Sequence, residues 1–158
     1  MAYFNLGAAL NSSGHYVEVV QRLLEAKERH LEGSEGWAHA TAEAFDLLRP
    51  EECDEVAKPE WWNDEGLKAL SARVLRAAPN EETAFDMRAE VLSGHGGGAW
   101  EAGPRSAAEL KEAAVCFDRS AAMCGAPVQK ARLADLAARC RSGAEAKAAR
   151  EISATYLY

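Results

Sequence analysis

The stretch AYFNLGAALNSSGHYVEVVQRLLEAKERHL, residues 2–31, decides the expected fold. Its apolar residues recur at steps of three and four, which is the period of an amphipathic helix. The polar break Ser12-Ser13-Gly14 interrupts this period, so the stretch predicts two helices, at 2–12 and 15–31. Because the link between them is short, we expect the two helices to pack as one antiparallel pair.

The same helical spacing continues along the rest of the chain, and no sustained alternation of apolar and polar residues indicates strands. Prolines and glycine-containing breaks divide the chain into further segments. We therefore expect an all-α fold of about eight helices in a single domain, 1–158. Its antiparallel pairs are predicted at 2–31, 35–78, 81–124 and 128–156, with insertions near 50–60 and 94–104.

Individual helix ends are also expected from the sequence. Pro50 stops a helix over 35–48, and Pro79 follows a helix over 60–78. Ser106 and Glu109 have the spacing of a capping box, which predicts the start of a helix that runs to about residue 124. Ser142-Gly143 predicts a break between two last helices at 128–141 and 144–156.

Composition and charge exclude several classes of protein. The chain has 158 residues, of which 48% are hydrophobic and 27% charged, as in an ordinary globular domain. The net charge of −7 disfavours nucleic acid as a partner, because phosphate backbones are bound by basic surfaces. We also expect no membrane insertion and no signal peptide, because no apolar run approaches the length of a bilayer span or follows a basic start.

The four cysteines predict a reducing compartment. Cys53, Cys116, Cys124 and Cys140 form no C-x-x-C pair and have no zinc-site spacing to histidine. We therefore interpret them as small buried hydrophobes. The expected location is the cytoplasm, and the nucleus or the interior of an organelle fits the same chemistry.

Residues 2–31 resemble a tetratricopeptide repeat (TPR). The resemblance is carried by Tyr3, Leu6-Gly7, Leu10, Gly14-His15-Tyr16, Val19, Leu23 and Ala26. Trp37 follows Tyr3 at the 34-residue length of that repeat. Later pairs match in part, and only when the two insertions are allowed. The resemblance implies a solenoid of stacked helix pairs, an α-α superhelix; another all-α bundle is the alternative.

The resemblance also implies a peptide-binding surface, because in this family the first helix of each pair lines a concave groove. Its candidate residues are Phe4, Asn11, His39, Phe45, Phe85 and Asp86. Chaperone-binding members clamp a C-terminal carboxylate with basic and amide groups, but Glu82 and Asp86 would repel one here. We therefore expect an apolar or basic segment as the ligand. The alternative for the phenylalanines is packing within or between repeats.

A second candidate interaction surface consists of Trp61, Trp62 and Trp100. Two adjacent tryptophans on one helix cannot both face the same core, so one of them is expected to cover an insertion or to stay partly exposed. An exposed tryptophan is a common anchor of protein interfaces. The alternative is that Trp100 folds its glycine-rich loop back onto the helices, against Trp61 or Trp62.

No pattern in the sequence indicates catalysis, a metal or a cofactor. His95-Gly96-Gly97-Gly98 matches an esterase oxyanion loop, but the G-x-S-x-G elbow that this chemistry needs is absent from the sequence. The four histidines form no i, i+4 pair for a metal. We therefore expect no enzyme, but an adaptor whose partner is another protein or a peptide. The alternative is a structural or self-assembling scaffold subunit that uses the solenoid ends, with a homo-oligomer as one form and a longer repeat array as another.

Overall fold

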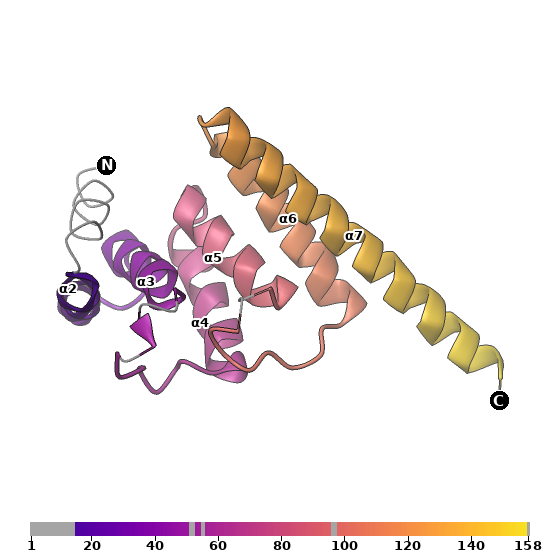
Figure 1. Ribbon diagram of the computed structural model, residues 1–158, viewed down its shortest axis with the longest axis horizontal. Coiled ribbons are helices and arrows are strands. Elements are labelled where there is room, and N and C mark those ends of the chain that lie inside the picture. The colour runs from indigo at the N-terminus through magenta and orange to yellow at the C-terminus, as the bar shows by residue number, and fades with distance from the viewer. Residues whose placement is uncertain (1–14, 51–52, 55, 96–97, 158) are drawn as a thin grey trace.

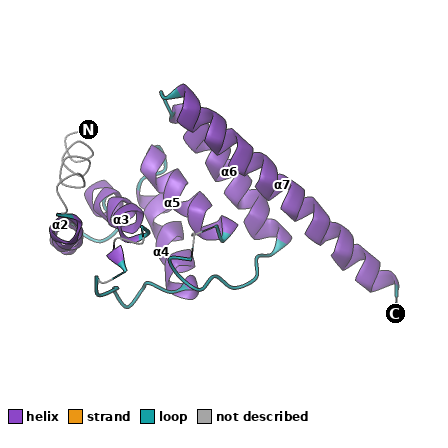
Figure 2. Cartoon of the chain, viewed as in Figure 1, coloured by secondary structure: helices purple, strands orange, loops and turns teal. Residues whose placement is uncertain are grey.

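The computed structural model describes residues 15–50, 53–54, 56–95 and 98–157. Within these ranges the chain forms α-helices and no strand, which confirms the all-α prediction (Figure 2). The helices are α2 Tyr16–Arg29, α3 Glu35–Leu48, α4 Asp64–Ala77, α5 Glu82–Ser93, α6 Ala107–Met123 and α7 Pro127–Tyr156. The predicted helix at 2–12 lies outside the described residues.

Each described helix packs against the next one along the chain. Contacts join α2 to α3, α3 to α4, α4 to α5, α5 to α6 and α6 to α7. In addition, α3 contacts α5 directly. Figure 1 shows α6 and α7 side by side at one end of the molecule and α2 at the other. The two longest connections join α3 to α4 and α5 to α6, where the sequence predicts its two insertions.

Short-range capping explains where several helices begin and end. The Ser34 hydroxyl accepts a hydrogen bond from the backbone N–H of Trp37 (3.2 Å) at the start of α3. The side chain of Asn63 accepts one from Gly66 at the start of α4. Ser106 and Glu109 make both bonds of the predicted capping box.

The last helix differs from the prediction. Residues 127–156 form one continuous helix, α7, so the predicted division at Ser142-Gly143 is wrong. A glycine inside a helix costs about 1 kcal/mol relative to alanine, which packing can offset. Here α7 packs along α6, and a Cβ atom on Gly143 would lie 3.4 Å from the Cδ1 of Leu110. Gly143 therefore lies at the contact between the two helices and does not end either of them.

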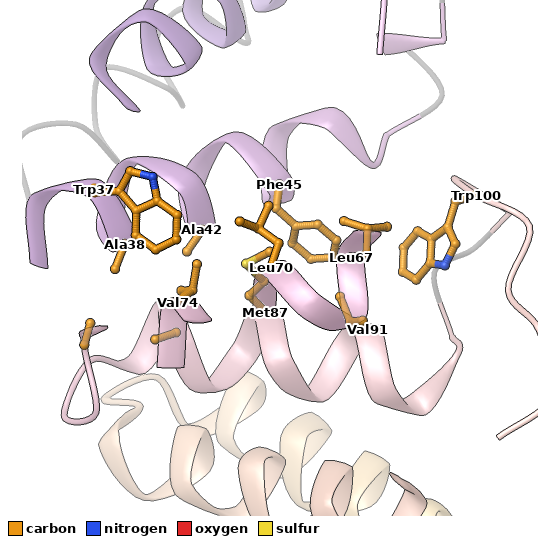
Figure 3. Packing of buried hydrophobic residues seen from close by; sticks show 12 residues of the cluster. Trp37, Ala38, Ala42, Phe45, Leu67, Leu70, Val74, Met87, Val91 and Trp100 are labelled. Atoms are coloured by element: carbon orange, nitrogen blue, oxygen red, sulfur yellow. The ribbon is translucent and has the colours of Figure 1, made fainter. Parts of the chain in front are cut away.

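The main core lies between α3, α4 and α5 (Figure 3). Phe45, Leu67 and Met87 are almost fully buried there, and Trp100 joins them from the connection between α5 and α6. A second cluster, which includes Phe117 and Leu133, fills the space between α5, α6 and α7. Cys116 and Cys140 belong to this second cluster, as expected for small buried hydrophobes.

No helix in the described part of the chain has both the length and the apolar character needed to cross a bilayer.

Candidate functional site

The direct contact between α3 and α5 places two of the candidate peptide-binding residues on neighbouring helices. His39 belongs to α3, and its side chain is 41% exposed. Its Nε2 lies 3.1 Å from a carboxylate oxygen of Glu43, one turn further along the same helix. Asp86 belongs to α5 and is partly exposed. Candidates Phe4 and Asn11 lie outside the described residues.

The two candidate phenylalanines of these helices pack in or against the hydrophobic core. Phe45 is 1% exposed, and its ring lies 5.6 Å from that of Trp62 and 5.9 Å from that of Trp100. Phe85 is partly buried and packs against the cluster between α5, α6 and α7. The expectation that Phe45 offers its ring to a ligand is therefore corrected, because this ring has almost no accessible surface. The alternative of packing between helices describes both residues.

Carboxylates gather where α5 faces α3. Glu82, Asp86 and Glu90 follow one another at four-residue steps on α5, which places them on one side of that helix. Asp46 on α3 and Arg49, the residue directly after α3, supply charges from the other helix. The guanidinium of Arg49 binds the Asp46 carboxylate and lies 3.2 Å from the Glu90 carboxylate. We call these five side chains the α3–α5 joint.

The α3–α5 joint has more negative than positive charge. No hydrogen bond or ion pair joins the Asp86 carboxylate to any other residue that the structure describes. Burial, followed by the charges of Glu90 and Asp46, raises the pKa of Asp86 to about 7. Burial also raises the pKa of Glu90, although Arg49 opposes this shift. The Arg49 guanidinium thus acts on three carboxylates: it pairs with Asp46 and Glu90, and it acts on Asp86 only through its charge.

The second candidate surface is largely built into the fold. Trp61 and Trp62 precede α4, which begins at Asp64, so the expectation that they lie on one helix is wrong. The indole N–H of Trp62 donates to the carbonyl of Ala99 (2.9 Å), and its ring meets that of Trp100 edge-on at 6.2 Å. Trp100 is 8% exposed. The alternative that Trp100 folds the glycine-rich loop back against a neighbouring tryptophan is therefore confirmed. Trp61 remains partly exposed, with the ammonium group of Lys27 5.9 Å from its ring.

Sequence reasoning missed a second charged joint, which fastens this loop to α4. Arg105 has a side chain only 5% exposed, and its two terminal nitrogens donate to the two carboxylate oxygens of Asp64 at 2.9 Å and 2.6 Å. Trp100 and the backbone N–H of Gly103 donate to the same carboxylate. Arg105 also donates to the carbonyl of Val91 on α5. We call this set the Arg105–Asp64 joint.

The donors around Asp64 change its acidity. The hydrogen bond from Arg105, assisted by that from Trp100, lowers the pKa of Asp64 to about 2. Only one local signal marked the region, namely the capping box that begins directly after Arg105. No sequence spacing connects Arg105 with Asp64, because the two lie on separate helix pairs.

Two further observations concern groups that can hold a metal ion or act as a nucleophile. In the described ranges, no group of three or more His, Cys, Asp or Glu side chains is arranged to hold a metal ion. Burial raises the pKa of Cys116 to about 11, so this thiol is protonated near neutral pH and a poor nucleophile.

Comparison of the chain with protein-family models, with curated protein sequences and with solved structures found no match. The resemblance to tetratricopeptide repeats therefore rests on the residues quoted above, and the stacking of eight helices into a solenoid stays a prediction.

Proposed function

We propose that this chain is a protein-interaction module without catalytic activity of its own. Its ligand in this proposal is a basic or mixed apolar and basic peptide segment that binds across α3 and α5. One observation carries the proposal: His39 and Asp86, expected from the repeat resemblance to face a ligand, lie on two helices in direct contact. Cytoplasmic location and TPR-like stacking belong to the same proposal.

Charge favours the basic part of the ligand over the apolar part. Glu82 and Asp86 both retain some exposure on α5, and Glu43 and Asp46 are on α3. Phe45 is buried, so the face offers less aromatic surface than the sequence suggested. A Lys or Arg side chain would supply the donors that Asp86 does not receive within the described chain.

Selection from a peptide library tests this proposal directly. The probe is a library of displayed peptides of about 15 residues, long enough for roughly four helical turns. We expect selected peptides to be enriched in Lys and Arg, and their affinity to fall with added salt. His39→Ala and Glu82→Gln are expected to weaken binding of a selected peptide, measured by fluorescence anisotropy. Asp135→Asn is the matched control, because Asp135 is an exposed carboxylate on α7.

Several outcomes would contradict the proposal. Selection of acidic peptides would reverse its electrostatic basis. Equal weakening by Asp135→Asn would show that net charge, and not the face of α3 and α5, governs binding. Failure to select any peptide, with the protein folded by circular dichroism, would favour the second candidate function.

That second candidate is a structural or self-assembling scaffold, and a different observation favours it. Ile152 and Tyr156, one turn apart on the last turns of α7, are 59% and 86% exposed. Figure 1 shows this part of α7 continuing beyond α6. A scaffold would cover these side chains by association. Sedimentation velocity over a range of concentrations distinguishes the two functions, because only the scaffold is expected to gain mass, and Ile152→Lys would then reduce that gain.

A further inference from the structure

We propose that the contact between α3 and α5 is a proton-sensitive joint, tight while the carboxyl group of Asp86 carries a proton and loosened when Asp86 ionises. This inference concerns the fold itself and does not depend on the proposed function. It rests on which charged groups the two helices bring together.

Negatively charged groups outnumber positively charged groups at this contact. The charges that act most on Asp86 are those of Glu90 and Glu82 on α5 itself, Asp46 on α3, and Arg49 directly after the end of α3. Arg49 is engaged with Asp46 and Glu90. Like charges four residues apart on a helix repel each other, so Asp86 has a repelling neighbour one turn away on each side. Ionising Asp86 adds a further negative charge without adding a donor.

The nearby positive groups act mainly on Glu90. His95, in the connection after α5, and Arg132 of α7 both stabilise the Glu90 carboxylate electrostatically. Neither of them is among the main charges that act on Asp86, and none of those main charges comes from α4 or α6, which also pack against α5. The positive charge beyond Arg49 is therefore placed toward one end of the row of carboxylates, and Asp86 depends on Arg49.

The α3–α5 joint lies between two packed helices. Glu90 is 8% exposed and the side chain of Arg49 is 24% exposed, so the group lies partly out of water. Charges interact more strongly there than on an open surface. Ala42 and Phe45 of the main core lie on α3 within one turn of Asp46. Repulsion in the joint therefore acts on helices that also hold the core.

The direction of the pH effect follows from proton linkage. The pKa of Asp86 is raised from an ordinary 3.8 to about 7 in the folded chain. A group with a raised folded pKa holds its proton in the closed state and loses it when the contact opens. The free energy of opening therefore falls as the pH rises from about 4 to about 7, and it levels off above that range.

Hydrogen exchange of backbone amides measures this opening. Wild-type protein is compared with Asp86→Asn at the same pH, so that the intrinsic exchange rates cancel for each amide. The ratio of the wild-type rate to the variant rate is expected to rise about tenfold or more between about pH 5 and pH 7.5 for amides of α3 and α5. Amides in the part of α7 that packs on α6 are expected to keep a constant ratio.

Two controls keep the test specific. Asp135→Asn removes one carboxylate from α7, where Asp135 is 60% exposed and paired with Arg139. We expect this variant to exchange like the wild type at every pH. If Asp86→Asn fails to fold, a carbon-13 NMR titration of the Asp86 carboxyl group in the wild type gives an independent answer. A midpoint near neutrality supports the joint.

Three results would overturn the inference. One is a rate ratio that stays flat with pH in α3 and α5. Another is an equal pH dependence in α6 and α7, because Asp86 would then act on the whole fold and not on this contact. The third is an Asp86 midpoint near the ordinary value of an aspartate, which would show that its ionisation meets no opposition.

Discussion

The Arg105–Asp64 joint, which fastens the α5–α6 connection to α4, and the α3–α5 joint each depend on one arginine, yet their charges are arranged differently. At Arg105 a single carboxylate receives two guanidinium hydrogen bonds, an indole N–H and a backbone N–H. At Arg49 one guanidinium is shared among three carboxylates, those of Asp46, Glu90 and Asp86. We therefore expect the Arg105–Asp64 joint to hold more firmly, because its carboxylate has more hydrogen-bond donors than the carboxylates around Arg49.

The largest expected effect comes from removing the arginine of the Arg105–Asp64 joint. Arg105→Ala leaves the partly buried Asp64 carboxylate without its main partner, and it frees the loop that carries Trp100. We expect the free energy of unfolding to fall by about 3–5 kcal/mol, measured by urea denaturation. Arg141→Ala is the control, because Arg141 and Asp118 are each 50% exposed. Its expected cost is about 0–1 kcal/mol. Equal losses in the two variants would show that burial adds nothing to the Arg105–Asp64 joint.

The second-largest expected effect is that acid weakens the Arg105–Asp64 joint. The pKa of Asp64 is lowered from 3.8 to about 2, so the unfolded chain takes up the proton first as the pH falls. The contribution of Asp64 is therefore complete above about pH 4 and is lost as the pH approaches 2, with an expected size of about 2 kcal/mol. Unfolding measured across this range should show a steeper loss in the wild type than in Asp64→Asn. Parallel curves would contradict the lowered pKa.

The sequence was informative about helix ends and uninformative about both joints. Capping needs only residues within one turn, so the start at Ser106 was visible in the sequence. The pairing of Arg105 with Asp64 depends on how a long connection folds back, and no local spacing encodes that. Phe45 was misplaced for the same reason, because the tryptophans that cover it come from two connections and not from a helix period.

The continuity of α7 shows a related limit of prediction from the sequence. A Ser-Gly pair favours a break in an isolated helix, yet here the packing surface of α6 runs past it. Charge offered a partial signal: the sequence placed Asp86 on the face of a predicted helix, but only the contact with α3 revealed the competition for Arg49. Long-range packing thus decides both where the last helix continues and where charge accumulates.

Removing Arg49 from the α3–α5 joint is expected to have a smaller and pH-dependent effect on the free energy of unfolding. Without Arg49 the carboxylates around Asp86 lose their shared cation, but at low pH Asp86 and Glu90 avoid repulsion by keeping their protons. We expect Arg49→Gln to cost about 1–2 kcal/mol at about pH 8 and less at about pH 5. Urea denaturation at the two pH values tests this. The Arg105→Ala variant is the reference, because its cost is expected to be the same at both. A pH-independent cost of Arg49→Gln would show that its contact with the Phe45 ring, 5.2 Å away, matters more than charge.

The smallest expected effect comes from Glu82, which raises the pKa of Asp86 less than Glu90 and Asp46 do. Repulsion between like charges four residues apart is worth about 0.2–0.5 kcal/mol. Glu82 also lies in the first turn of α5, where a negative charge is favourable, so Glu82→Gln is expected to change the free energy of unfolding very little. The NMR titration midpoint of Asp86 is the better measurement, and it is expected to move to lower pH by a few tenths of a unit.

Glu81→Gln provides the matched control for this last change, because Glu81 lies at the same helix end but is absent from the main charges that act on Asp86. If the four-residue row on α5 is what opposes ionisation, only Glu82→Gln moves the midpoint. If both variants move it equally, the field of the helix terminus controls Asp86. The α3–α5 joint would then differ from the Arg105–Asp64 joint in its position along a helix and not in its supply of donors.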